Sequence, residues 1–150
     1  RECGMDVVFH GVLVKPGRYT MMGKMGKTYV FGLPGNPLAA IVNLMYIITP
    51  YLLKLSGERS YYIDFVYAKN MQTFKLSKGR ANMVLGTLKN GEFFVTKGGK
   101  YGSGMITPLI ESNAILFTKN GLAEVKEGDI LKIVPMNYSL RPDFADMINT

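Results

Sequence analysis

Residues 31–37 read FGLPGNP and mark the point where an extended segment turns into a helix. Asn36 is a preferred N-cap residue, and Pro37 suits the first helical position, where its missing N–H has no partner to lose. We therefore predict a helix that begins at Pro37. Because a helix N-terminus favours negative charge through its unpaired N–H groups and its dipole, the segment 33–37 is a candidate anion-binding turn.

The predicted helix continues to about Leu55 and carries apolar residues on almost every side. This pattern is typical of a helix that packs on a sheet inside a larger domain. Gly57 is expected to end it. Pro50 lies inside the helix and cannot donate to the Tyr46 carbonyl, so we predict a kink or a break just before Pro50.

The apolar run at residues 38–53 is interrupted by Asn43, Thr49 and Pro50, and it is shorter than the roughly 20 apolar residues that a membrane-spanning helix needs. We therefore predict no membrane span. The single cysteine, Cys3, cannot form an internal disulfide, and the N-terminus has no apolar signal segment. We expect a reduced, cytoplasmic chain that is a fragment of a longer protein.

Upstream of the helix, the pattern predicts a strand at residues 6–14 and a hairpin built from residues 19–22 and 28–31. One helix is too little to cover both faces of a mainly parallel sheet, and this segment offers no other. Residues 1–58 are therefore predicted to be the C-terminal half of a larger α/β domain.

Residues 59–137 are predicted to form a small all-β unit with about six strands, the size of a small barrel or sandwich. The expected strands are 61–68, 71–76, 82–88, 92–96, 114–118 and 130–134. Asn90-Gly91 gives a strong hairpin signal between two of them. Ser103 is expected to cap a short helical turn over 105–112, and residues 138–150 are expected to be a mobile tail. The predicted fold class is thus α/β plus all-β.

The chain of 150 residues is 47% hydrophobic, which excludes simple disorder, and its net charge of +7 admits anionic partners. The basic residues fall singly and form no run of five, as a nucleic-acid-binding tail would. His10 is the only histidine, so a closed zinc site is out of reach. The segment 15–18 (KPGR) is a second candidate anion-binding turn, because it holds two cations on a turn made rigid by proline. Both turns can also be ordinary loops.

The sequence resembles the molybdopterin molybdenumtransferase family, which includes bacterial MoeA and the E domain of gephyrin. The similarity rests on residues 14–18 (VKPGR), on 31–37, and on the helix that ends at 55–57 (LSG). The β-rich half is similar to the C-terminal domain of that family, in the segments 78–80, 102–105, 111–116 and 127–129. The resemblance implies that residues 1–58 belong to a MogA-like, molybdopterin-binding α/β domain and that a small β-barrel-like domain follows.

The resemblance further implies an enzyme of molybdenum cofactor biosynthesis, which inserts molybdate into adenylylated molybdopterin and releases AMP with the help of Mg²⁺. The ligand-binding residues that it implies are Lys15, Gly17, Arg18, Pro34, Gly35, Asn36, Pro37 and Ser103. The glycine-rich pterin motif of the family and the acidic residues that hold the divalent ion are absent from this sequence. We therefore expect no metal ligands in this chain, no activity from the chain alone, and catalytic residues in the remainder of a full-length protein.

Two other functions remain open at the level of sequence. A gephyrin-like scaffold would use the same architecture to bind peptides, and a basic β-domain could bind nucleic acid. We favour the enzyme and expect neither a nucleic-acid nor a membrane partner. The family resemblance implies a homodimer and, as a further partner, a molybdopterin adenylyltransferase.

Overall fold

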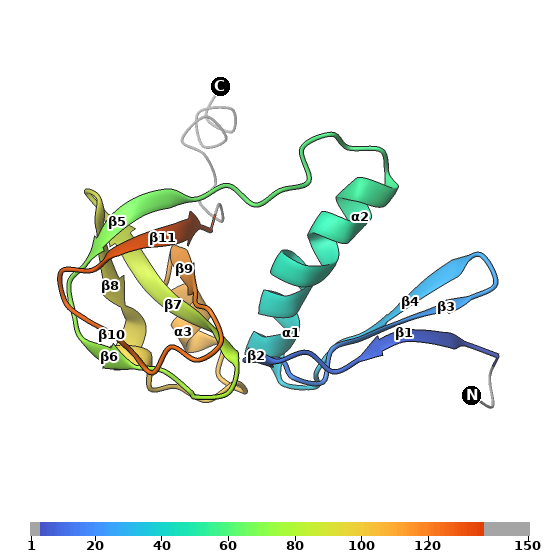
Figure 1. Cartoon of the computed structure of the whole chain (residues 1–150), viewed down its shortest axis with the longest axis horizontal. Helices are drawn as coiled ribbons and strands as arrows, with labels where there is room; N and C mark the ends of the chain where they lie inside the picture. Colours follow the sequence, from blue (N-terminus) through green and yellow to red (C-terminus); the bar gives the residue numbers. More distant parts are fainter. Residues whose placement is uncertain (1–3, 137–150) are drawn as a thin grey trace, which may run out of the picture.

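The computed structural model describes residues 4–136, and the predicted tail at 138–150 lies outside them. In chain order the elements are β1 (Asp6–His10), β2 (Val14–Lys15), β3 (Met21–Met25), β4 (Thr28–Gly32), α1 (Pro37–Asn43), the π-helical turn η1 (Leu44–Ile48), α2 (Thr49–Leu55), β5 (Val66–Asn70), β6 (Phe74–Lys75), β7 (Ala81–Lys89), β8 (Glu92–Val95), the 3-10 turn η2 (Thr96–Gly99), α3 (Thr107–Ile110), β9 (Ala114–Phe117), β10 (Glu124–Val125) and β11 (Ile130–Pro135). One long helix lies between a barrel and a separate antiparallel sheet (Figure 1).

Five strands form the closed barrel, in the order β7-β8-β5-β11-β9, and the pairing of β9 with β7 closes the ring. Strands β7 and β8 form the hairpin predicted at Asn90-Gly91, where both residues have the positive φ angles, 52° and 78°, that a two-residue hairpin turn requires. The structure is mostly β, with one long helix and a closed barrel, and this confirms the predicted barrel-like β-domain. The domain boundaries at 58 and 137 stay a prediction.

Successive residues of β7 point into two different hydrophobic cores. Val84 faces the barrel interior, whose buried residues are Ala68, Phe74, Val84, Phe93, Val95, Ala114, Leu116, Val125 and Ile133. Met83 and Leu85 face outward into a second core, whose buried residues are Leu38, Val42, Met83, Leu85, Ile115, Val134 and Met136. Since residues of α1 belong to this second core, the helix covers one outer face of the barrel. That cover explains why β7 is apolar at consecutive positions rather than at alternate ones.

The helix predicted from Pro37 is continuous to Leu55, and the break considered before Pro50 does not occur. One π-helical turn, η1, precedes the proline instead. Within it, the backbone N–H of Thr49 donates to the Leu44 carbonyl, and the Thr49 hydroxyl donates to the same oxygen at 2.9 Å. The wider turn lets the helix pass a residue that has no N–H to donate.

The two halves of this helix differ in burial. Leu38 and Val42 of α1 are each 1% exposed, whereas α2 has no buried residue and Leu52 and Leu55 are 46% and 50% exposed. The helix from Pro37 to Leu55 is long and apolar enough to cross a membrane. Core helices of soluble proteins also meet these two criteria of length and composition. Packing on the barrel accounts for the apolar residues of α1 but not for those of α2. The absence of a membrane partner stays a prediction.

The predicted strand at residues 6–14 is in fact two strands. Gly11 has a φ of 94° and its N–H donates to the Thr20 carbonyl at 2.9 Å, so the chain turns there. Before the turn, β1 joins β3 and β4 in a three-stranded antiparallel sheet; after it, β2 pairs in parallel with β7, with Lys15 opposite Asn82. The N-terminal segment therefore adds a strand to the sheet of the barrel, which periodicity could not reveal.

Three further predictions about the β-rich part were wrong in extent. The strand expected from residue 61 begins only at Val66, and Tyr61 and Tyr62 before it stack on each other with ring centroids 4.5 Å apart. The strand expected at 71–76 is only β6, which pairs with the unpredicted β10. The helical turn expected at 105–112 is only α3, and Ile106 rather than Ser103 is its N-cap.

Candidate functional site

A pocket of about 590 Å³ lies between the N-terminal segment and the barrel. It is lined by Val14, Lys15, Pro16, Gly17, Arg18, Tyr19, Pro34, Asn36, Leu38, Ala39, Phe74, Lys75, Leu76, Ser77, Arg80, Asn82, Met83, Val84, Gly99, Tyr101, Gly102 and Ser103. Four of these side chains are cationic, and none carries a carboxylate. The pocket therefore has a surplus of positive charge, which favours an anionic ligand.

Most of the predicted site residues meet at this pocket. Lys15, Gly17 and Arg18 come from the first predicted turn, Pro34 and Asn36 from the second, and Ser103 comes from the barrel side. The structure thus brings together predicted residues that are up to 88 positions apart. The other two predicted residues, Gly35 and Pro37, are exposed and lie next to lining residues without lining the pocket themselves.

The turn at residues 15–18 is fixed by two buried side chains. The Asn43 amide of α1 donates to the Gly17 carbonyl at 3.2 Å, and the Thr20 hydroxyl donates to the same oxygen at 3.0 Å. Gly17 has a φ of 107°, and a Cβ there would overlap the Asn43 amide. Only glycine therefore lets the turn lie this close to the helix.

Asn36 stands at the N-cap as predicted, but its side chain does not cap the helix. Its amide Nδ2 donates instead to the Ser103 hydroxyl at 2.9 Å, which links the helix start to the barrel. The prediction that Ser103 caps a helical turn is wrong, because α3 begins only at Thr107 and Ser103 lies in the loop before it. Both residues line the pocket.

The barrel supplies residues that the sequence did not assign to the site, namely Lys75, Ser77, Arg80, Asn82 and Tyr101. The Lys15 ammonium donates to the Ser77 hydroxyl at 2.6 Å, across the boundary between the N-terminal segment and the barrel. Arg80 belongs to the segment 78–80 that carries part of the family resemblance. The resemblance in the segments 78–80 and 102–105 was the signal that could have identified Arg80 and Gly102 as further candidates.

Tyr101 forms part of the inner wall of the pocket. Its hydroxyl oxygen accepts a hydrogen bond of 2.7 Å from the backbone N–H of Leu85. Burial raises the pKa of Tyr101, because the phenolate is less well solvated there than the neutral phenol, while the hydrogen bond from Leu85 works in the opposite direction. Tyr101 therefore stays neutral and adds no charge to the pocket at physiological pH.

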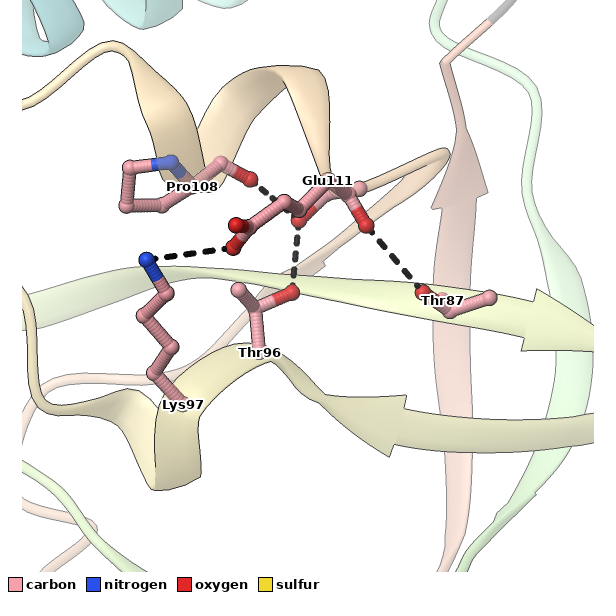
Figure 2. Close-up of polar contacts among 6 residues, drawn as sticks. Thr87, Thr96, Lys97, Pro108 and Glu111 are labelled. Carbon is pink, nitrogen blue, oxygen red and sulfur yellow. Dashed lines mark hydrogen bonds and ion pairs between the residues drawn. The ribbon is translucent and has the colours of Figure 1, made fainter.

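A polar cluster holds α3 against the barrel (Figure 2). Inside the cluster, the hydroxyls of Thr96 and Ser112 lie 2.6 Å apart, and Ser112 donates to the Pro108 carbonyl at 2.6 Å. At its rim, Lys97 and Glu111 form an ion pair of 3.2 Å, and the two side chains are 40% and 45% exposed.

Within residues 4–136, no group of three or more His, Cys, Asp or Glu side chains is placed to hold a metal ion. The pocket itself is lined by no carboxylate, the usual protein ligand of Mg²⁺. The lining of this pocket therefore does not fit a Mg²⁺ site.

Residues 67–136 match the family described as the MoeA C-terminal region (domain IV). Among curated proteins, the chain is 26% identical over 142 residues to the molybdopterin molybdenumtransferase of Haemophilus influenzae, which covers 90% of this chain and 34% of that protein. It is 25% identical over 131 residues to the enzyme of the same name from Staphylococcus epidermidis, with 86% and 31% covered. The chain thus spans about a third of the length of the curated relatives it matches.

Solved structures with the same arrangement come from two archaea. The molybdopterin biosynthesis MoeA protein of Pyrococcus horikoshii superposes with a TM-score of 0.75 at 27% identity, covering 86% of this chain and 32% of that one. A molybdenum cofactor biosynthesis protein of Pyrococcus furiosus gives 0.76 at 27% identity, with 87% and 46% covered. Residues 67–136 thus match the MoeA C-terminal region, and most of the chain is similar to molybdopterin molybdenumtransferases and to MoeA structures.

Proposed function

We propose that this chain is the C-terminal part of a protein of molybdenum cofactor biosynthesis and that its pocket binds an oxyanion group of the substrates, either molybdate or a phosphate of molybdopterin. The observation that carries the proposal is the charge of the pocket: Lys15, Arg18, Lys75 and Arg80 line it, and no carboxylate does. Relatives named molybdopterin molybdenumtransferase support the choice of substrates.

The chemistry of the pocket suits such ligands. Molybdate, the pterin phosphate and the phosphates of an adenylylated substrate are all anions that accept several hydrogen bonds. An arginine can donate two parallel hydrogen bonds to such a group, and a lysine supplies a compact charge. The helix start adds to this effect, because Leu38 and Ala39 also line the pocket and the Asn36 side chain does not cap the helix.

The roles that we assign to this chain are binding and orientation. Lys15 and Arg80 would hold the oxyanion from opposite sides of the boundary between the N-terminal segment and the barrel, and Asn36 and Ser103 would close the pocket beside it. Insertion of molybdate and release of AMP are proposed for the full-length protein. Its remaining part would carry the catalytic residues and the ligands of Mg²⁺, since no carboxylate lines the pocket of this chain.

We also propose that residues 1–58 are the C-terminal half of a MogA-like α/β domain. Two observations support this proposal. None of the residues of α2 is buried, and the chain spans only about a third of the length of its curated relatives. The front half of the domain would cover α2. The proposed full-length protein is cytoplasmic and homodimeric and receives its substrate from a molybdopterin adenylyltransferase.

Calorimetric titration of this chain tests the pocket directly. Molybdate is titrated first, and then molybdopterin or its adenylylated form in the presence of molybdate and Mg²⁺. We expect binding that weakens about tenfold in Lys15→Ala, which corresponds to the loss of one charged hydrogen bond. Lys69→Ala is the matched control, because Lys69 is an exposed lysine of β5 outside the pocket. Equal affinity in wild type and Lys15→Ala would contradict the proposal.

A further inference from the structure

We infer that Asn82 is a positioning residue that holds the barrel side of the pocket, and with it Lys15 and Arg80, in the arrangement that binds the anion. The inference rests on the proposed anion site. Asn82 belongs to β7, is 5% exposed and lies directly opposite Lys15 in the parallel pairing of β2 with β7. Asn82 thus lies where the N-terminal segment and the barrel meet.

The backbone of Asn82 is anchored to the chain just after the neighbouring barrel strand, β9. Its N–H donates to the Thr118 hydroxyl at 3.0 Å, and its carbonyl accepts from the Thr118 N–H at 2.9 Å. Both backbone groups are therefore used within the barrel, and the position of the Asn82 side chain is set by the closed sheet rather than by the loop that it contacts.

The side chain of Asn82 closes the loop at residues 77–80. Its oxygen Oδ1 accepts from the Ser77 N–H at 3.0 Å, and its nitrogen Nδ2 donates to the carbonyls of Ser77 and Arg80, each at 3.1 Å. Both amide hydrogens have partners, and they are all the donors of this group. The amide oxygen has a partner as well. No other standard side chain of this size has one acceptor and two donors in that arrangement.

Two cations of the pocket depend on this loop. The Ser77 hydroxyl accepts from the Lys15 ammonium at 2.6 Å, and the backbone of Arg80 is one of the groups that Asn82 holds. Ligands bind more tightly to side chains that are already ordered, because less conformational entropy is lost on binding. Asn82 thus acts on the ligand through Ser77, Lys15 and Arg80.

The experiment compares Asn82→Ala with Asn70→Ala in the whole chain, with molybdate as the titrant. Asn70 is a matched control: it is 0% exposed, lies in β5 outside the pocket, and also donates from Nδ2 to two backbone carbonyls, those of Gln72 and Lys126, at 2.7 Å each. We expect both variants to have lower melting temperatures. Only Asn82→Ala should weaken molybdate binding, by about tenfold.

A double-mutant cycle with Arg80→Ala separates positioning from a general loss of stability. If Asn82 acts by placing Arg80, its substitution should weaken binding much less in the Arg80→Ala background than in the wild type. Fully additive effects would overturn the inference, as would equal weakening in the Asn70→Ala control. Absence of molybdate binding in the wild type would instead contradict the proposed function itself.

Should Asn82→Ala fail to fold, Ser77→Ala tests the same chain of contacts, because it removes the anchor of Lys15 without opening the buried amide site. We expect it to weaken molybdate binding by about threefold. Unchanged affinity in Ser77→Ala would overturn the inference, because Lys15 would then need no anchor on the loop that Asn82 closes.

Discussion

Gly17 and Asn43 meet where the 15–18 turn lies against the C-terminal end of α1. Substituting Gly17 by alanine introduces a Cβ that overlaps the Asn43 amide at a backbone φ of 107°. We expect Gly17→Ala to lower the free energy of unfolding by about 2–4 kcal/mol, through backbone strain and the displaced amide. Urea denaturation measures this. Gly35→Ala is the control, because a Cβ at Gly35 would meet no atom within 4 Å; an equal loss there would contradict the prediction.

Tyr101 gives a prediction about pH. Its pKa is raised above the ordinary value of 10.0 by burial, so above about pH 10 the unfolded chain loses this proton before the folded chain does. The contribution of Tyr101 to stability is complete below pH 10 and is lost as the pH rises through the folded pKa. Urea denaturation between pH 8 and 11 should show a steeper decline for wild type than for Tyr101→Phe. Parallel curves would refute this assignment.

At the residue scale, the sequence could predict those candidate site residues that lie in turns with their own local signal. Lys15, Arg18 and Asn36 stand beside glycine and proline, and the structure places all three at the pocket. Asn82 and Tyr101 carry no such signal. Their positions depend on the pairing of β2 with β7 and on the hydrogen bond to Leu85, which are long-range contacts that no local pattern encodes.

At the scale of elements, α3 is held on the barrel by buried and exposed contacts of unequal strength. Ser112→Ala leaves the Thr96 hydroxyl without its partner, and we expect it to lower the free energy of unfolding by about 1–3 kcal/mol. Glu111→Gln breaks only the exposed ion pair with Lys97 and should change stability by less than about 1 kcal/mol. Urea denaturation of both variants checks the ranking. The reverse order would mean that the ion pair, rather than the buried hydroxyls, holds α3.

The elements differ in how well the sequence predicts them. The prediction of a hairpin at Asn90-Gly91 was correct, because its signal lies in two adjacent residues. The residues around Pro50 could not decide between a break and a π turn, because either one accommodates a proline, which has no N–H to donate. The strand break at Gly11 was also missed, because residues 7–14 read as one β-branched run although β1 and β2 join different sheets.

At the scale of the whole molecule, the long helix has one covered half and one open half. The open half carries exposed leucines at 44, 52, 53 and 55, and we expect the isolated chain to self-associate through them. Analytical ultracentrifugation should show association that decreases in a Leu52→Lys, Leu55→Lys double variant. Ile130→Lys is the control, since Ile130 is 66% exposed on the barrel. A monodisperse wild-type monomer at high concentration would contradict the expectation.

The two-residue strand β2 has a thermodynamic consequence. Because it brings Lys15 of the N-terminal segment beside the barrel, a ligand in the pocket touches two parts of the chain that are far apart in sequence. Such a ligand binds only when both parts are folded and docked, so it acts as a reversible crosslink between them. At a ligand concentration of about 100 times Kd, this linkage would stabilise the docked state by about 2.7 kcal/mol. The melting temperature of the chain should therefore rise with ligand concentration, and a melting temperature that does not change with ligand would contradict this expectation.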